Sequence, residues 1–460
     1  MSMNNDFVWG TASSAYQIEG AHNRDGKGPS IWDTFTATHG HTAHDDTGET
    51  ACCHYDLYEE DIKLMAQLGI KAYRFSICWP RVFPNGDSQI NNKGLQFYDN
   101  VVNCCIANGI TPYITLYHWD LPQVLQDKGG WLNRDTSYAF AEYAASMCQH
   151  FSDRADNFFT INEPQIVSMM GYYSGLHAPG LKLSIKETFN VLHNLALAHG
   201  LAVKAMRKSC QKPVHIGFSS TGNLCYPSDE NEDDVNMARK STFNVNHDTW
   251  GFCHTIFCDM TLLGRYPDIK DSKLLTSLFH DSMASQRNHA PSQYSALSFV
   301  KDGDIDIMHQ TVDFLGLNIY NGHEVNYLGP VPKIAGAPRT ALKWPITPQV
   351  MNWGVRFVYE RYNLPIYITE NGLSCNDKTY LDGKVHDQDR IDFLTRYIRE
   401  LEKASNEGIH ILGYFHWSFT DNFEWHSGYD ERFGLVYIDY ATQQRIPKDS
   451  AYWYRDYISQ

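Results

Sequence analysis

Two glutamates stand where apolar, strand-like runs of the sequence end. One run, 365–369, stops at Glu370 ahead of an Asn-Gly turn signal, and the other, 158–162, stops at Glu163 ahead of a proline. A buried strand that ends in Glu and then turns places a carboxylate at the rim of a sheet. Two such places in one chain predict chemistry that uses a pair of carboxyl groups.

The composition is that of an ordinary soluble globular protein. Of 460 residues, 43% are hydrophobic, 20% are charged and 13% are aromatic. Aromatic side chains offer apolar faces to flat, hydroxylated ligands such as sugars, although a large core also uses many of them. The net charge of −15 argues against binding to nucleic acid. No run approaches the ~20 apolar residues of a membrane span, so we expect no membrane partner.

The cysteines and the first residues indicate a cytoplasmic protein. The chain has 11 cysteines, an odd number, scattered along its length. This pattern fits reduced thiols better than a disulfide framework. Residues 1–6 lack both the basic start and the apolar stretch of a secretory signal. We therefore expect a cytoplasmic location.

Strand-like and helical segments alternate along the chain, without a linker or low-complexity tract between them. Eight strands with intervening helices predict one (β/α)8 TIM barrel of the α/β class, a single domain over residues 1–460 with elaborated βα loops. A doubly wound sheet is the alternative, but no Gly-rich phosphate motif follows the first strand. The expected strands are Phe7–Ala12, Lys71–Ile77, Thr111–Tyr117, Phe158–Asn162, Val214–Ser220, Val312–Tyr320, Pro365–Glu370 and Ile411–Trp417. The clearest helices are Tyr55–Leu68, Gly94–Asn108, Ser137–Phe151, Ile185–Lys208 and Asp387–Ala404.

Polar and aromatic residues gather where the expected strands end. In a barrel of parallel strands all of these ends lie at one rim, where active sites form. Carboxylates, amides, histidine and tryptophan there would line a polar pocket with apolar walls, which suits a pyranose ring. The residues in these positions are Gln17, Arg74, His118, Trp119, Asn162, Glu163, Asn318, Tyr320, Glu370, Trp417, Glu424 and Trp425.

Several motifs, taken together, resemble the family 1 glycoside hydrolases, the retaining β-glucosidases. Residues 160–164, Thr-Ile-Asn-Glu-Pro, resemble the family's acid/base segment, and residues 368–372, Ile-Thr-Glu-Asn-Gly, resemble its nucleophile segment. Residues 116–122, Leu-Tyr-His-Trp-Asp-Leu-Pro, and 421–425, Asp-Asn-Phe-Glu-Trp, also match in the order that the family shows. The resemblance covers nearly the whole chain.

The resemblance implies a double displacement at the sugar. Glu370 would be ionised and attack the anomeric carbon, while Glu163 would protonate the leaving oxygen and later activate water. Retention of configuration requires the two carboxyl groups to be about 5–5.5 Å apart. Since they are far apart in sequence, only barrel closure can bring them together. Arg74 and the Tyr320 hydroxyl would keep Glu370 ionised.

The resemblance also implies substrate-binding roles for other residues at this rim. Some would bind hydroxyl groups of the sugar, and the tryptophans would pack against its ring or its leaving group. The implied roles are the 2-hydroxyl for Asn162 with support from Asn318, the outer hydroxyls for Gln17, His118 and Glu424, the platform for Trp417, the walls for Trp119 and Trp425, and the leaving-group side for Trp353.

The implied substrate is a terminal β-D-glucosyl residue of cellobiose, a short oligosaccharide or an aryl glucoside, with β-galactosides and β-fucosides as side substrates. Family members that act on 6-phosphorylated sugars place Ser and Lys after the last strand, whereas this chain has Glu424, which repels phosphate. A 6-phospho-β-glucosidase is therefore the weaker alternative. A non-catalytic carbohydrate-binding relative is another, although such relatives typically lack one carboxylate. The 221–311 connection and the 328–348 loop are expected to shape the leaving-group side.

We expect neither a metal nor a cofactor. Residues 39–46 contain three histidines and two aspartates, but they lie in an expected exposed loop away from the strand ends. Cys253, His254 and Cys258 lack the second pair that would complete four ligands. A metal-dependent barrel hydrolase would need His, Asp or Lys ligands at several strand ends, and this rim offers mainly Glu, Asn, Trp and Gln. The sequence leaves the oligomeric state open.

Overall fold

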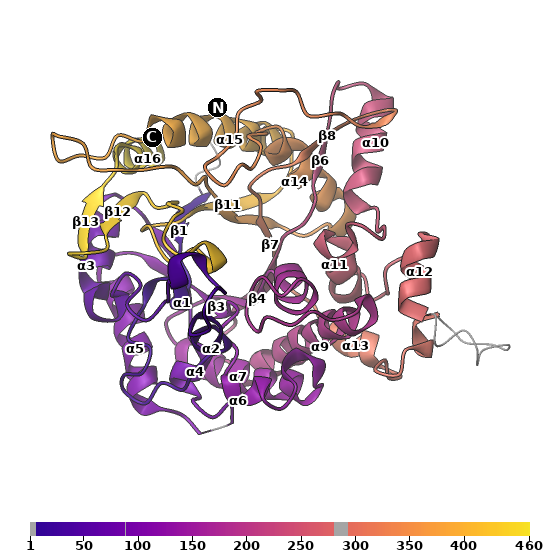
Figure 1. Cartoon of the computed structure of the whole chain (residues 1–460), viewed down its shortest axis with the longest axis horizontal. Coiled ribbons are helices and arrows are strands. Elements are labelled where there is room, and N and C mark those ends of the chain that lie inside the picture. Colours follow the sequence, from indigo (N-terminus) through magenta and orange to yellow (C-terminus); the bar gives the residue numbers. More distant parts are fainter. Residues whose placement is uncertain (1–5, 88, 280–292) are drawn as a thin grey trace.

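The computed structural model describes residues 6–87, 89–279 and 293–460 (Figure 1). Residues 1–5, on which the absence of a secretory signal was partly predicted, lie outside the described residues. Residues 280–292, which belong to the expected 221–311 connection, lie outside them as well.

Eight parallel strands close into a barrel, which confirms the predicted fold class (Figure 1). The barrel strands are β1 (Val8–Ala12), β2 (Ala72–Ser76), β3 (Thr111–Tyr117), β4 (Asn157–Asn162), β5 (His215–Ser220), β7 (Leu315–Asn318), β10 (Ile366–Asn371) and β11 (Ile411–Trp417). Their order around the ring is β1-β11-β10-β7-β5-β4-β3-β2. Strand β1 closes the ring because it pairs with both β11 and β2. All carboxyl ends therefore meet at one rim.

Helices surround the barrel, and the five predicted from amphipathic patterns are found within two residues of their expected ends. The helices are α1 (Ala15–Ile18), α2 (Ile31–Thr36), α3 (His54–Gln67), α4 (Trp79–Val82), α5 (Asn92–Ala107), α6 (Gln123–Gln126), α7 (Asp135–Phe151), α8 (Pro164–Ile166), α9 (Ile185–Ser209), α10 (Glu232–Phe243), α11 (Thr255–Leu262), α12 (Ser272–Phe279), α13 (Asp304–Met308), α14 (Val350–Tyr362), α15 (Gln388–Asn406) and α16 (Asp449–Ile458). Within the described ranges, none of them combines the length and apolar character that a membrane crossing requires.

Two small sheets are formed by segments outside the barrel ring. Strands β12 (Val436–Asp439) and β13 (Gln444–Pro447) pair after β11. Strands β6 (Cys225–Pro227), β8 (His323–Asn326) and β9 (Gly329–Pro330) form the other sheet. Because β6 follows β5 and β8 follows β7, this second sheet joins the loops of two neighbouring barrel strands. Helices α10 and α14 lie beside it (Figure 1).

Aromatic side chains fill the barrel interior beneath the rim. The Tyr113 ring lies 4.9 Å from that of Phe415, and the Phe159 ring lies 4.9 Å from that of Phe314, between ring centroids. All four are buried. The Arg74 guanidinium lies 5.1 Å from the Phe159 ring centroid, so the polar groups of the rim stand on an apolar floor. Such a floor limits the access of water from below and strengthens electrostatic interactions above it.

Gly200 of α9 lies against the backbone of α13. A Cβ atom there would lie 2.0 Å from the carbonyl oxygen of Ile307, so Gly200→Ala must push the two segments apart. We expect a loss of about 1–3 kcal/mol in the free energy of unfolding, measured by thermal or urea denaturation. Lys204→Ala, at an exposed position of the same helix, should change it by less than about 0.5 kcal/mol. Equal stability of Gly200→Ala and the wild type would contradict this close contact.

Candidate active site

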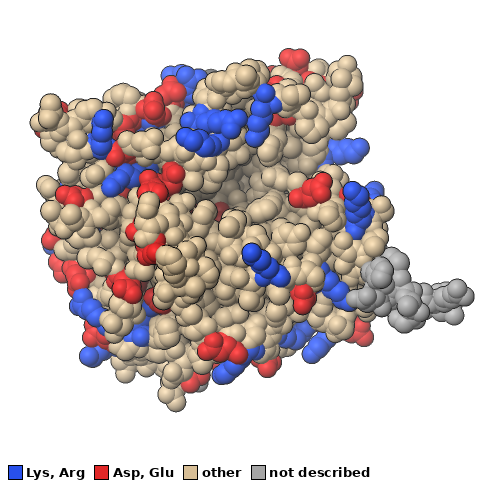
Figure 2. Space-filling view, viewed as in Figure 1, with Lys and Arg blue, Asp and Glu red and all other residues tan. Residues whose placement is uncertain are grey.

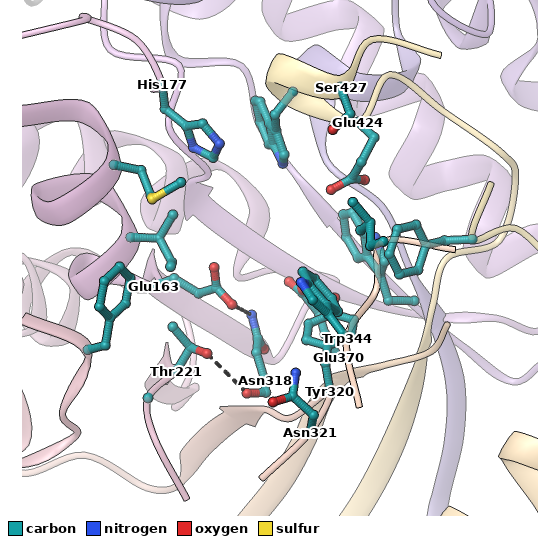
Figure 3. A pocket seen from close by; sticks show the side chains of 18 of the residues that line it. Glu163, His177, Thr221, Asn318, Tyr320, Asn321, Trp344, Glu370, Glu424 and Ser427 are labelled. Atoms are coloured by element: carbon teal, nitrogen blue, oxygen red, sulfur yellow. Dashed lines mark hydrogen bonds between the residues drawn. The ribbon is translucent and has the colours of Figure 1, made fainter. Parts of the chain in front are cut away.

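Glu163 directly follows β4 and begins a sharp turn into a helix. Its backbone is left-handed, with φ of 48°, and its N–H donates to Ser219 O of β5 at 2.8 Å. Pro164 then starts α8, where the missing N–H of proline has no helical partner to lose. This turn directs the Glu163 side chain into the barrel mouth (Figure 3). A left-handed glutamate is strained, as functional residues often are.

Glu370 lies on β10 and is bound by two donors. Arg74 Nη1 of β2 donates to its Oε1 at 2.8 Å, and the Tyr320 hydroxyl donates to its Oε2 at 2.8 Å. Both side chains of the ion pair are buried. Burial raises the pKa of Glu370, and the Arg74 charge together with these hydrogen bonds opposes that rise.

Glu163 has a neutral donor in place of a cation. Its Oε1 accepts a hydrogen bond at 2.8 Å from Asn318 Nδ2, at the end of β7. Burial, and after it the negative charge of Glu370, raise the pKa of Glu163 to about 8. The two carboxyl groups are therefore close enough to influence one another, but their surroundings favour a proton on Glu163 and a charge on Glu370.

Asn162, the last residue of β4, connects several polar groups of the rim. Its Oδ1 accepts from Arg74 Nη2 at 2.6 Å and from Asn318 Nδ2 at 3.1 Å. Its Nδ2 lies 3.1 Å from His118 Nε2, and because an amide nitrogen only donates, the ring proton of His118 stands on Nδ1. Burial and the nearby Arg74 charge hold the pKa of His118 well below its usual range. Neutral His118 has an Nδ1–H without a partner in the described part of the chain.

Tryptophan side chains form the walls of the site. The ring centroids of Trp119 and Trp425 are 4.4 Å apart, and Trp119 Nε1 donates to Asn162 O at 2.9 Å. The His118 ring stacks 5.8 Å from that of Trp417. These apolar faces stand beside hydrogen-bonding groups, as recognition of a sugar ring requires.

Glu424, which follows β11, is a third carboxyl group at the cavity, and it is half-buried. Burial, followed by the charges of Glu370 and Glu431, raises the pKa of Glu424 to about 8. Its Oε2 has no hydrogen-bond partner among the described residues. A cavity-lining carboxyl group with a free oxygen can bind hydroxyl groups of a ligand.

These side chains line a cavity of about 510 Å³ at the carboxyl ends of the strands (Figure 3). It opens as a hollow near the centre of one face of the molecule (Figure 2). Its lining, within the described residues, contains no Lys or Arg. Arg74 and Asn162 lie behind the cavity surface and contact the residues that form it. The predicted residues that line the cavity are His118, Trp119, Glu163, Asn318, Tyr320, Glu370, Trp417, Glu424 and Trp425.

Gln17 is fully buried and does not reach the cavity lining. Its Nε2 donates to Asn422 Oδ1 at 3.0 Å and to Phe423 O at 2.9 Å, and its Oε1 accepts from Ser14 Oγ at 2.6 Å. These bonds hold the segment that leads to Glu424. A direct contact between Gln17 and a sugar hydroxyl stays a prediction.

Trp353 does not line this cavity, and its predicted position at the leaving group stays a prediction. It is half-buried on α14, where its ring packs 5.7 Å from that of Phe357 and Arg356 lies 5.4 Å from its centroid. Trp344, which precedes α14, does line the cavity, and its ring centroid lies 5.3 Å from that of Tyr320. Trp344 belongs to the 328–348 loop, whose part in shaping the site was predicted without singling out this residue.

Other lining residues carried no signal in the sequence. His177 follows a π-helical segment, Val167–Tyr173, and its Nε2 lies 3.3 Å from His426 Nδ1. Thr221 and Asn321 line the cavity from the segments after β5 and β7. Their positions depend on how long loops fold back over the rim, which residue types and periodicity do not encode.

The histidine-rich segment 39–46 contacts itself and residues 429–430 at the surface. His39 Nδ1 lies 2.7 Å from Asp45 Oδ2, and both side chains are exposed. Among residues 6–87, 89–279 and 293–460, no group of three or more His, Cys, Asp and Glu side chains is arranged to hold a metal ion.

A (β/α)8 barrel whose rim holds two interacting carboxyl groups among tryptophans defines the class of barrel hydrolases that cleave glycosidic bonds. A sequence model described as glycosyl hydrolase family 1 matches residues 1–460. β-Glucosidase A of Thermotoga maritima is 42% identical over 459 residues, which cover 98% of this chain and 96% of that protein. The chain belongs to glycosyl hydrolase family 1, which confirms the resemblance found in its motifs.

Two further comparisons agree with this assignment. A bifunctional β-D-glucosidase/β-D-fucosidase of Bifidobacterium breve is 39% identical over 482 residues, which cover 98% of this chain and 97% of that protein. A solved structure of a β-glucosidase from Thermotoga maritima in complex with glucoimidazole has a TM-score of 0.86 and 40% identity. That match covers 99% of this chain and 98% of the other.

Tyr320→Phe removes one hydrogen bond to Glu370 and leaves Arg74 in place. Loss of a bond to a charged group should raise the pKa of Glu370 by about one unit. We therefore expect the acidic limb of the pH profile of kcat/KM for glycoside hydrolysis to move to higher pH by about that amount. Tyr113→Phe is the control, because its hydroxyl lies 3.4 Å from Tyr367 in the barrel floor. An acidic limb that stays in place in Tyr320→Phe would show that this bond does not stabilise the ionised form.

Proposed function

We propose that this chain is a retaining β-glucosidase in which Glu370 is the nucleophile and Glu163 is the acid/base. The observation that carries the proposal is the unequal environment of the two carboxyl groups. Arg74 and Tyr320 hold Glu370, whereas the amide of Asn318 holds Glu163. This difference supports a proton on Glu163 and a charge on Glu370 at neutral pH, as the first step of a double displacement requires.

In the first step, a carboxylate oxygen of Glu370 attacks the anomeric carbon of a β-glucoside. The bond from that carbon to the leaving oxygen breaks, and the proton of Glu163 passes to the leaving oxygen. The products are a covalent glycosyl ester on Glu370, the free alcohol and an ionised Glu163. Asn162, which directly precedes Glu163, is proposed to bind the 2-hydroxyl of the sugar, where hydrogen bonds strengthen in the transition state.

In the second step, Glu163 acts as a base. Ester formation removes the charge on Glu370 that contributes to the raised pKa of Glu163, so the pKa of Glu163 falls only after its proton has been used. Water then attacks the anomeric carbon and gives a proton to Glu163, and the ester bond breaks. Glucose leaves with retained β configuration, and both carboxyl groups return to their starting states.

The polar groups that line the cavity opposite Glu163 support a glucosyl residue without a phosphate group as the substrate. The carboxyl group of Glu424 and the free N–H of His118 are suited to hydroxyl groups. A 6-phosphate would meet the carboxyl group of Glu424, and no Lys or Arg stands among the described lining residues. We therefore retain the β-glucosidase over the 6-phospho-β-glucosidase. A side activity on β-fucosides is supported by the name of the Bifidobacterium breve relative.

We further propose a cytoplasmic enzyme with one catalytic domain over residues 1–460, acting on aryl glucosides and on cellobiose or short oligosaccharides such as those released from cellulose. All 11 cysteines are free, which supports a reducing compartment. The pairing of β1 with β11 supports one domain, because the ring needs strands from both ends of the chain.

A fluorinated substrate tests the nucleophile directly. In 2-deoxy-2-fluoro-β-glucosyl fluoride the fluorine slows both steps, while the good leaving group lets the first proceed, so the ester should accumulate. We expect intact-protein mass spectrometry to show one added sugar and peptide mapping to place it on Glu370. Glu370→Gln is the matched control and should remain unlabelled. A label on another residue would contradict the assignment of the nucleophile.

The pH dependence tests the acid. The pKa of Glu163 is raised to about 8, and Glu163 must be protonated in the first step, so kcat/KM should fall as the pH rises above that value. Glu163→Gln cannot donate its proton and should lower kcat/KM for cellobiose by about 10²–10⁴-fold. An activated 2,4-dinitrophenyl glucoside needs little protonation, and with it the variant should lose less activity and show no alkaline limb. An alkaline limb that persists in Glu163→Gln would assign it to another group.

A further inference from the structure

A second cavity, of about 600 Å³, adjoins the first on its outer side. It lies among β6, β8, the end of α10 and the loop that follows β9, in the upper right of Figure 1. The mechanism described above uses none of the residues that line it.

Three separate segments run from the first cavity into the second. After β5, Thr221 lines the first cavity, Asn223 lines both, and Tyr226 lines the second. After β7, His323 lines both cavities. In the 328–348 loop, Trp344 lines the first cavity, and residues 345–347, which follow it, line the second cavity. Because three segments make this transition at the same place, the two spaces meet along a shared wall.

The shared wall lies on the side of the acid. Thr221 Oγ1 donates to Asn318 O at 3.2 Å, and Asn318 in turn donates to Glu163. In Figure 3, Thr221, Asn318 and Asn321 lie below Glu163, whereas Glu424 lies on the other side of the cavity. Since Glu163 delivers its proton to the leaving oxygen, the leaving group extends toward the second cavity.

The second cavity combines an apolar surface with unpaired cations. Pro330, Pro338 and Ile346 contribute apolar surface. Lys333 and Arg339 also line it, and neither forms an ion pair with any described residue. Glu324 is the one carboxylate among its described lining residues, and its Oε1 accepts a hydrogen bond from Ser228 Oγ at 2.9 Å. Arg339 also borders a neighbouring surface cavity that contains Asp377 and Asp389.

Lys333 is close enough to the shared wall to act on it. Burial, and after it the Lys333 charge, lower the pKa of His323, the residue that lines both cavities. The local excess of positive charge contrasts with the net charge of −15 of the whole chain. Few aromatic side chains are present to stack on a second sugar, since Tyr226 is the one aromatic ring among the described lining residues apart from His323.

We infer that the second cavity receives the outer part of a leaving group that carries an apolar ring and ends in a carboxylate. Such a leaving group would place its ring against the prolines and its carboxylate near Lys333 and Arg339. The inference rests on the proposed β-glucosidase function and names a substrate class for it, the β-glucosides of phenolic acids. Both cations are exposed, so their attraction is of the size of a surface ion pair and is screened by salt.

Two matched substrates test the inference. In 4-(2-carboxyethyl)phenyl β-D-glucoside the carboxylate is separated from the ring by two methylenes, so the corresponding primary amide has a leaving group of nearly the same basicity. The ratio of kcat/KM for the acid to that for the amide measures the effect of the charge. We expect a ratio of about five in the wild type at low ionic strength, the size of one exposed ion pair. It should fall toward one in 0.5 M NaCl and in the double variant Lys333→Gln/Arg339→Gln.

The control variant is Lys128→Gln, an exposed lysine beyond α6 on the opposite side of the barrel, which should keep the wild-type ratio. 4-Nitrophenyl β-D-glucoside reports the basal activity of each protein. Two results would overturn the inference alone, provided that 4-nitrophenyl β-D-glucoside is hydrolysed. One is an acid-to-amide ratio of one or less in the wild type, and the other is a ratio that the double variant does not change. Absence of hydrolysis of all three glucosides would overturn the proposed function and the inference with it.

Discussion

One buried guanidinium connects the strands that carry the site. Arg74 of β2 donates to Glu370 and to Thr369 O on β10, to Asn162 at the end of β4 and to Ser219 of β5. A buried cation without such acceptors would be strongly destabilising. The four strands can therefore pack only in a register that brings these oxygen atoms to Arg74. The same contacts give Glu370 its counter-charge, so the packing of the barrel and the protonation of the site depend on one side chain.

The barrel and the two glutamates could be predicted from the sequence because both depend on local patterns. Parallel strands are buried on both faces and appear as short, nearly continuous apolar runs, and eight such runs set the fold. Glu163 and Glu370 each follow such a run directly, so their place at the rim follows from the strand assignment. The least accurate strand was Val312–Tyr320, observed as Leu315–Asn318. The prediction added residues on either side of Leu315–Asn318 that do not belong to the observed strand.

Side chains supplied by long loops could not be predicted in the same way. Trp353 and Trp344 both follow the β8–β9 hairpin, and nothing in their local sequence distinguishes them. Trp353 falls within α14 and packs against Phe357, while Trp344 precedes the helix and lies in the cavity. The choice depends on where α14 begins, and helix boundaries are less certain than helices themselves. Gln17 shows another limit of prediction from sequence. A glutamine side chain can bind a sugar hydroxyl, but it can equally well form the buried hydrogen bonds that Gln17 makes to residues 422–423.

The contact between Arg74 and Glu370 also determines when the site can form during synthesis. It joins residues 296 positions apart, and β1 completes the ring only with β11, which ends at Trp417. While the ribosome is still producing β10, the guanidinium of β2 lacks its ion-pair partner Glu370. Contacts over such distances close late, and until then apolar strand edges are exposed. The carboxyl pair is therefore one of the last features of this chain to be assembled, and the edges of the earlier strands stay unpaired until β10 and β11 have been made.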